Sequence, residues 1–255
     1  MRECSAVWGL LAAAVMAVVA AAPADAADPD ALWKIVHSKC VPNEEQHADP
    51  SPCALVDVTR GLGDGYVVLK DINGATQYLL IPTERITGIE DPQLLGPGAP
   101  NYFAAAWAQR SYTERAAGHA LPRDGLSLAV NSRFGRSQNQ LHIHIDCIRP
   151  EIRDALRRQA ETFGDSWAPL AETFAGHRYS AMRVAAEDLA AADPFKLLAA
   201  AKPAAMSQQT LVVTGAEFAG GRPGFVLLND QTDLATGDRA SGEELQDHAC
   251  ALAHP

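Results

Sequence analysis

Residues 141 to 146 read Leu-His-Ile-His-Ile-Asp, and this strict alternation restricts the possible folds more than any other segment of the chain. A period of two is that of a β-strand, so Leu141, Ile143 and Ile145 are expected on one face and the titratable side chains on the other. A strand of this kind needs neighbouring strands for its backbone and a core for its apolar face. The rest of the chain should therefore supply a sheet with helices packed on it.

Other segments carry matching signals. Residues 66 to 71 and 77 to 82 are apolar and are separated by turn-forming residues, which predicts a β-hairpin. Residues 126 to 132 and 140 to 148 are expected to pair as antiparallel neighbours. Further strands are predicted at 177–184, 210–214 and 225–229, helices at 31–39, 101–117, 151–163 and 185–202, and a loop between Cys40 and Cys53. The fold class predicted is α+β with an antiparallel sheet.

The N-terminus has the pattern of an export signal. An apolar, mostly alanine run extends from Ala6 to Ala22, and the Ala24-Asp25-Ala26 triplet offers a cleavage site. Residues 1–26 are thus interpreted as a signal peptide or, alternatively, an uncleaved membrane anchor, and residues 27–255 as a single domain. The chain has 21 basic and 31 acidic residues, a net charge of −10, and no basic stripe, so nucleic acid is not an expected partner.

Four cysteines remain once an export segment carrying Cys4 is removed. An even count in an oxidising compartment favours disulfides over free thiols, and four cysteines allow three pairings. We prefer Cys40 with Cys53, which closes a short Pro-rich loop, and this leaves Cys147 to pair with Cys250. The other pairings and four buried free thiols remain alternatives.

The polar face of the alternating strand carries His142, His144 and Asp146. Three titratable groups in a row are costly to bury without partners, so they are expected to face a polar cavity. Two other interpretations stand beside this one. In one, the face is an ordinary exposed face of a strand. In the other, the histidines bind a metal, which needs further ligands that the spacing does not provide.

These residues also carry a resemblance to a known family. Asn131, Gly135, Gln138, His142 and His144 have the order and spacing seen in histidine-triad nucleotide hydrolases and transferases. The stretch from Asn131 to Pro150, and the terminal Glu-Leu-Gln-Asp-His at 244 to 248, resemble CDP-diacylglycerol pyrophosphatases, a divergent branch. The resemblance implies a histidine-triad-like fold with a C-terminal elaboration, and hydrolysis of CDP-diacylglycerol to CMP and phosphatidate.

The resemblance also implies roles for residues. Aligning Gln138 with the family's glutamine makes His144 the nucleophile that forms a nucleotidyl-histidine, and His142 the orienting histidine. Asp146 stands where the family usually has a third histidine. In the alternative register, which starts at Gln140, His142 is the nucleophile.

Other groups must then stabilise the phosphates. We expect Arg133 and Arg136 to do this, while Lys70 is interpreted as an ordinary strand-end charge. Asn131, Gln138, Gln140 and Asp146 are the further candidates for substrate binding. A Cys147–Cys250 bridge would bring His248 near the strand, where it could replace the missing histidine. No metal or cofactor is expected.

The leading hypothesis is an enzyme that meets its lipid substrate at a membrane surface, on the periplasmic face of the inner membrane. One alternative is a soluble nucleotide-diphosphate hydrolase or nucleotidyltransferase with the same chemistry. Another is a non-catalytic periplasmic module that binds nucleotide or metal.

Overall fold

The computed structural model describes Met1 and residues 28 to 253. The predicted export segment therefore lies, apart from Met1, outside the described residues. In the part of the chain that is described, none of the helices combines the length and apolar character needed to cross a membrane.

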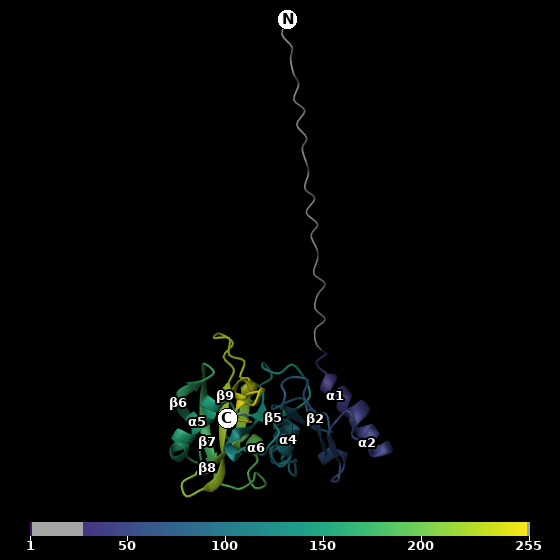
Figure 1. Ribbon diagram of the computed structural model, residues 1–255, viewed down its shortest axis with the longest axis horizontal. Helices are drawn as coiled ribbons and strands as arrows, with labels where there is room; N and C mark the ends of the chain where they lie inside the picture. The colour runs from purple at the N-terminus through teal and green to yellow at the C-terminus, as the bar shows by residue number, and fades with distance from the viewer. Residues whose placement is uncertain (2–27, 254–255) are drawn as a thin grey trace.

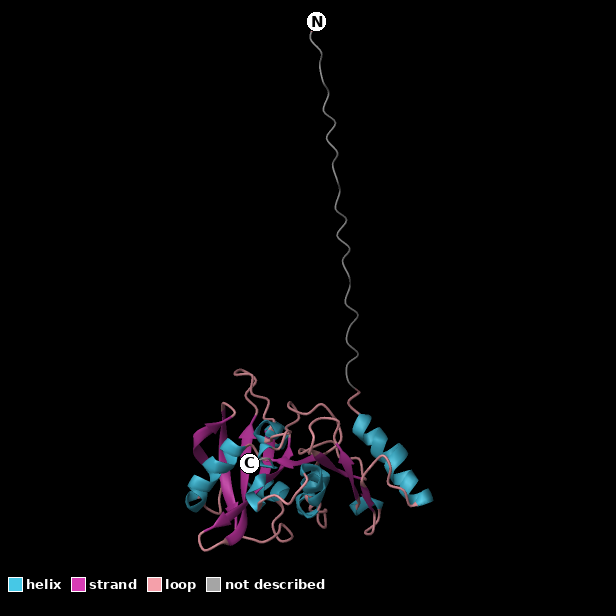
Figure 2. Ribbon diagram, in the orientation of Figure 1, coloured by secondary structure: helices cyan, strands magenta, loops and turns pink. Residues whose placement is uncertain are grey.

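A single antiparallel sheet runs through the described residues, and it has nine strands in the order β1-β2-β3-β5-β4-β8-β9-β7-β6 (Figure 2). All its neighbouring strands pair antiparallel. The strands are β1 Leu55–Asp57, β2 Tyr66–Lys70, β3 Tyr78–Pro82, β4 Leu126–Val130, β5 Ile143–Cys147, β6 Ala168–Phe174, β7 His177–Val184, β8 Gln209–Phe218 and β9 Arg222–Gln231. The predicted fold class, the hairpin and the pairing of β4 with β5 are confirmed.

Helices lie along both faces of this sheet (Figure 1). The α-helices are α1 Ala31–Ile35, α2 Val41–His47, α3 Tyr102–Ala108, α4 Ser111–Ala117, α5 Pro150–Gln159 and α6 Pro194–Ala201, and a π-helical turn, η1 Val36–Cys40, joins the first two. Short 3₁₀ turns are η2 Leu62–Asp64, η3 Pro92–Leu95, η4 Arg123–Gly125, η5 Ala160–Thr162, η6 Met206–Gln208, η7 Gly242–Leu245 and η8 Ala251–Ala253.

The covering helices leave one strip of the sheet open to a cavity. Helices α3, α4 and α6 pack on one face, where Ile143 and Ile145 of β5 are fully buried in the main core. The opposite face is divided. The segment from α1 to α2 covers β2 and β3 at one end, and α5 with η7 covers β4, β8 and β9 at the other. Strand β5 lies between these two covers, and its polar face lies beneath the gap.

One loop prediction and two helix predictions need correction. The Cys40 to Cys53 segment was predicted to be a loop, but the helix continues through α2 to His47. Proline removes a backbone donor and crowds the preceding turn. The chain accommodates Pro42 by widening the turn before it, so that the Val41 amide bonds the carbonyl of Val36, five residues back.

The helix predicted over residues 185 to 202 is confirmed only from Pro194 onward. Proline favours the first turn and disfavours helix in the residue before it. Asp193 accordingly caps α6 by accepting a hydrogen bond from the Phe195 amide. The helix predicted over 101–117 is divided into α3 and α4, because the chain bends at Gln109 and carries Thr113 to the carbonyl of Ile145. Strands β1 and β6 were not predicted.

Candidate active site

The alternating strand has the two faces that its sequence predicts. His142, His144 and Asp146 lie on the face opposite the isoleucines and are 7%, 4% and 0% exposed. His144 is directly opposite Leu79 of β3 on one side and Ala129 of β4 on the other. The rings of His142 and His144 meet edge to face, with their centroids 4.8 Å apart. The two imidazoles are therefore held as a pair on a rigid central strand.

A cavity of about 260 Å³ opens over this pair, and both histidines line it. Its wall on one side is apolar and comes from α1 and the hairpin. Polar groups from the loop before β5 and from η7 line the rest. The residues used in the argument below are Leu32, Ile35, Leu69, Lys70, Leu79, Asn131, Gln138 and Glu243.

His144 is neutral and has one nitrogen without a partner. Burial, with smaller contributions from the charges of His142 and His248, lowers the pKa of His144 well below its usual value. Its Nδ1 lies 3.2 Å from Oε1 of Glu243 and 2.6 Å from the amide nitrogen of Gln77. An amide nitrogen can only donate, so a proton on Nδ1 requires the Gln77 amide in its other orientation, with the otherwise unpartnered Oε1 facing the ring. In that orientation the Nδ1 proton, shared with the Glu243 carboxylate, leaves the lone pair on Nε2. That Nε2 is buried and has no hydrogen-bond partner among the described residues.

Glu243 is itself held in place by a neutral donor. The Asn131 amide donates to Oε2 of Glu243 at 2.6 Å, and the side-chain amide of Gln77 lies 3.2 Å from Oε1. Sequence reasoning missed both Glu243 and Gln77. Glu243 directly precedes the 244 to 248 stretch that carries the family resemblance, and this position was the one available signal.

His142 has the same free nitrogen by a different arrangement. Its Nδ1 lies 2.7 Å from the backbone carbonyl of Gln140, which can only accept, so the ring donates there and holds its lone pair on Nε2. Burial lowers the pKa of His142 as well. Both imidazoles are thus chemically able to attack. They differ in that His144 has a carboxylate behind it and His142 has a peptide carbonyl.

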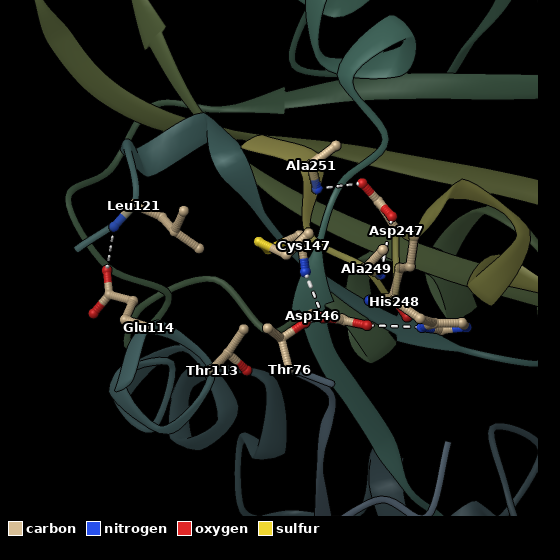
Figure 3. The surroundings of a disulfide bond; sticks show 12 residues. Thr76, Thr113, Glu114, Leu121, Asp146, Cys147, Asp247, His248, Ala249 and Ala251 are labelled. Carbon is tan, nitrogen blue, oxygen red and sulfur yellow. Dashed lines mark hydrogen bonds and ion pairs between the residues drawn. A yellow bond between two sulfur atoms is a disulfide. The ribbon is translucent and has the colours of Figure 1, made fainter. Parts of the chain in front are cut away.

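The chain from Asp247 to Cys250 brings a third imidazole to the strand. Both preferred disulfides are present, and the Cys147–Cys250 bridge has a Cα separation of 5.3 Å. Figure 3 shows the result, in which Nδ1 of His248 lies 2.7 Å from Oδ2 of the buried Asp146. Thr76 donates to the other oxygen of Asp146 at 2.6 Å. The hydrogen bond that His248 donates to the Asp146 carboxylate raises the pKa of His248, which favours an imidazolium at this position.

Comparison with known proteins agrees with this geometry. A family model described as CDP-diacylglycerol pyrophosphatase matches residues 27–254. This chain belongs to the CDP-diacylglycerol pyrophosphatase family. A CDP-diacylglycerol pyrophosphatase of Yersinia pestis is 44% identical over 226 residues, which cover 88% of this chain and 84% of that protein.

In this member of the CDP-diacylglycerol pyrophosphatase family, the two expected phosphate-binding arginines do not line the cavity. Arg136 makes two 2.7 Å hydrogen bonds to Glu90, and Arg133 is exposed. The cavity is lined instead by Lys70, which the sequence analysis took for an ordinary strand-end charge. Its Nζ donates to the backbone carbonyls of Asp71 and Gly74.

The remaining predicted residues also divide into those that line the cavity and one that does not. Asn131 and Gln138 line the cavity. The side-chain amide of Gln138 is already engaged, because it donates to the backbone carbonyl of Asp28 and accepts from the Leu32 amide. Gln140 is buried and donates to the backbone carbonyls of Pro82 and Glu84. Its side chain therefore fixes the loop after β3 and does not line the cavity.

Proposed function

We propose that this protein hydrolyses the pyrophosphate bond of CDP-diacylglycerol, giving CMP and phosphatidate, with Nε2 of His144 as the nucleophile. The observation that carries the assignment is the buried, unpartnered Nε2 of a neutral imidazole whose Nδ1 is backed by Glu243. Membership of the family supports the choice of substrate.

The first step forms a covalent intermediate. The lone pair of His144 Nε2 attacks the phosphorus that bears the cytidine, and the bond from that phosphorus to the bridging oxygen breaks. Phosphatidate leaves with the bond's electron pair. The ring becomes positive as the N–P bond forms, and the adjacent Glu243 carboxylate stabilises that charge.

In the second step the oxygen of a water molecule attacks the same phosphorus and the N–P bond breaks. The electron pair returns to His144 and CMP is released, while the water's proton passes to solvent or to the departed phosphatidate. Lys70 and the His248 imidazolium are the cationic groups that we assign to the pyrophosphate. Lys70 lines the cavity. His248 lies outside the cavity lining and is held beside β5 by its hydrogen bond to Asp146, where it would take the place of a third histidine on the strand.

The shape of the cavity favours a lipid substrate over a small soluble one. Its apolar wall includes Leu32 and Ile35 of α1 and Leu69 and Leu79 of the hairpin, and Ile72 at the hairpin turn is 97% exposed. Helix α1 also follows closely on the apolar N-terminal run. We propose that this side rests on the periplasmic face of the inner membrane, so that the headgroup enters while the acyl chains stay in the bilayer.

A trapping experiment tests the covalent step. The protein is mixed with CDP-diacylglycerol labelled at the cytidine-linked phosphorus, quenched in alkali after milliseconds, and digested. We expect label on a peptide containing His144, stable to base and labile to acid. His142→Ala should retain the adduct and His144→Ala should lose it. Turnover without any protein-bound label would exclude the covalent route, and label lost only in His142→Ala would assign the other histidine.

Two further measurements test the substrate. Hydrolysis in H₂¹⁸O should place the isotope in CMP, because water attacks the cytidine-bearing phosphorus. Isotope in phosphatidate would contradict that site of attack. Activity on CDP-diacylglycerol in mixed micelles should also exceed activity on water-soluble CDP-alcohols. Equal activity would favour the soluble nucleotide-diphosphate hydrolase.

A further inference from the structure

A second cluster of titratable groups lies apart from the histidine pair. It consists of His177 at the start of β7, Asp230 near the end of β9, and Asp238 in the loop that follows β9. One ligand atom from each lies within 4.8 Å of the others, and a cavity of about 500 Å³ opens over them. Within the described residues this is the one group of three such side chains spaced to hold a metal ion.

The two carboxyl groups are buried close to each other. Asp230 is 5% exposed and Asp238 is 6% exposed. Oδ1 of Asp230 accepts a hydrogen bond from the Gln231 amide at 2.7 Å, but its Oδ2 is buried and has no partner in the described part of the chain. An unpartnered carboxylate oxygen beside a second carboxylate is costly unless a proton or a cation lies between them.

We propose that His177, Asp230 and Asp238 bind a first-row divalent cation of the Zn²⁺ or Mn²⁺ kind. One imidazole nitrogen with two carboxylate oxygens suits such ions better than Ca²⁺, which takes oxygen ligands. Two ligands about 2.1 Å from one ion lie about 3.4 Å apart in tetrahedral geometry and at most about 4.2 Å apart, so a pair of atoms 4.8 Å apart must approach by about 0.6–1.4 Å. Water from the open cavity completes the coordination.

Neighbouring groups favour the same site. Nδ1 of His177 lies 2.8 Å from Oε1 of Glu244, which also accepts a hydrogen bond from the Tyr179 hydroxyl at 2.6 Å. Glu244 can therefore serve as a fourth ligand or orient the imidazole from behind.

The position of Glu244 gives the site a role. Glu244 and Glu243 are adjacent residues of η7, and Glu243 is the partner of His144. A cation bound beside Glu244 fixes η7 to β7 and β9 and so holds Glu243 in place. The cation does not take part in the chemistry in this proposal, and Glu244 is a positioning residue.

The test uses the full chain without an affinity tag, stripped with EDTA and dialysed. Zn²⁺ and Mn²⁺ are titrated separately by calorimetry, with Ca²⁺ for comparison, and bound metal is counted after dialysis. We expect one ion per chain. An excess of about 100-fold over Kd should raise the thermal midpoint by about 5–10 °C.

Variants locate the site. Asp230→Asn should weaken binding more than about 100-fold, since even partners outside the coordination shell are worth 10- to 100-fold. It should also abolish the metal-induced rise in Tm. Asp233→Asn is the matched control, because Asp233 lines the same cavity but lies outside the cluster, and it should bind normally. The His142→Ala/His144→Ala double variant should also bind normally.

Three results would overturn the proposal. They are the absence of saturable binding of either metal to the wild-type protein, wild-type affinity in Asp230→Asn, and loss of binding in the His142→Ala/His144→Ala variant. If Asp230→Asn does not fold, judged by circular dichroism, His177→Gln replaces it with the same expectations. Hydrolysis retained in the His142→Ala/His144→Ala variant, with metal binding intact, would count against the histidine mechanism and not against this site.

Discussion

Two polar cavities flank the short turn η7, and the same residue types behave differently in them. Glu243 lies within 3.2 Å of His144, and Glu244 lies 2.8 Å from His177. Burial lowers the pKa of His144. Around His177 burial acts in the same direction, but the hydrogen bond and charge of Glu244, with further acidic neighbours, outweigh it and raise the pKa.

The difference shows which effect dominates at each site. His144 is almost fully enclosed, so the cost of removing a charge from water decides its ionisation. The side chain of His177 is 30% exposed and acidic groups surround it, so attraction decides instead. The neutral imidazole of His144 suits the proposed nucleophile, and that of His177 suits a cation or a metal ligand.

The largest effect is expected when the nucleophile itself is removed. His144→Ala should lower kcat at least about 10⁴-fold, because the remaining imidazole of His142 has a peptide carbonyl and not a carboxylate behind it to stabilise the charged ring. His142→Ala should cost about 10- to 100-fold, since it misplaces the substrate or its neighbour's ring. Steady-state kinetics on both variants make the comparison. If the two values are reversed, the register that starts at Gln140 is the right one.

The adjacent glutamates should separate catalysis from stability. Glu243→Gln removes the charge behind His144 and should lower kcat about 10²-fold with little change in Tm. Glu244→Gln breaks hydrogen bonds with His177 and Tyr179 and should cost about 1–3 kcal/mol of stability, with a smaller effect on kcat. Denaturation curves and kinetics on the two variants provide the readout. Equal loss of kcat in both would show that η7 acts only as a structural unit.

The pH dependence should follow the lowered pKa of His144. The reaction needs the neutral ring, so kcat/KM should stay level as pH falls through 6.5 and decline only well below it. Stability should change with pH in the same direction. The unfolded chain takes up protons near 6.5 while the folded chain does not, so the free energy of unfolding falls as pH drops below 6.5. An acidic limb centred at 6.5 or above would contradict the assignment.

Lys70 should affect binding more than chemistry. Lys70→Met removes a cation that lines the cavity and should raise KM about tenfold while changing kcat little, because one charge-assisted hydrogen bond is worth about 1.5–3 kcal/mol. Lys39→Met, on an exposed side chain outside the cavity, is the control. An unchanged KM in Lys70→Met would remove it from the substrate site.

The smallest effect is expected at His248. Asp146 raises its pKa, so its contribution to stability is complete below pH 6.5 and is lost as pH rises through the raised pKa. The difference in Tm between wild type and His248→Gln should therefore be larger at pH 6 than at pH 9. The side chain of His248 is 39% exposed, so solvent screens its interaction with the buried Asp146 and the change in Tm should be small. A difference that grows toward pH 9 would contradict the ion pair.

The sequence predicts well those parts of the site that depend on local periodicity. The faces of β5, the hairpin before it and the two disulfides follow from alternation, turn chemistry and cysteine count. The sequence-based predictions fail for side chains whose contact partners are distant in the chain. Glu243 reaches Gln77 across 166 positions, and no local pattern carries that information.

The two arginines show the same limit from the other direction. Arg133 and Arg136 were chosen because they flank the histidine strand in sequence, but Glu90, 46 positions away, binds Arg136. Proximity along the chain gave the right type of charge and the wrong residue. Which cation faces the cavity is decided by the pairing of β2 with β3, which places Lys70 there.

The bridge between Cys147 and Cys250 joins the histidine strand to a segment that is synthesised much later. His248 and Glu243 come from a segment synthesised about a hundred residues after β5, and the strand that pairs with β4 on its far side, β8, is late as well. A nascent chain emerging through residue 150 carries both strand histidines without the groups that set their ionisation. Hydrolysis should thus require the segment through Cys250, which supplies Glu243 and His248.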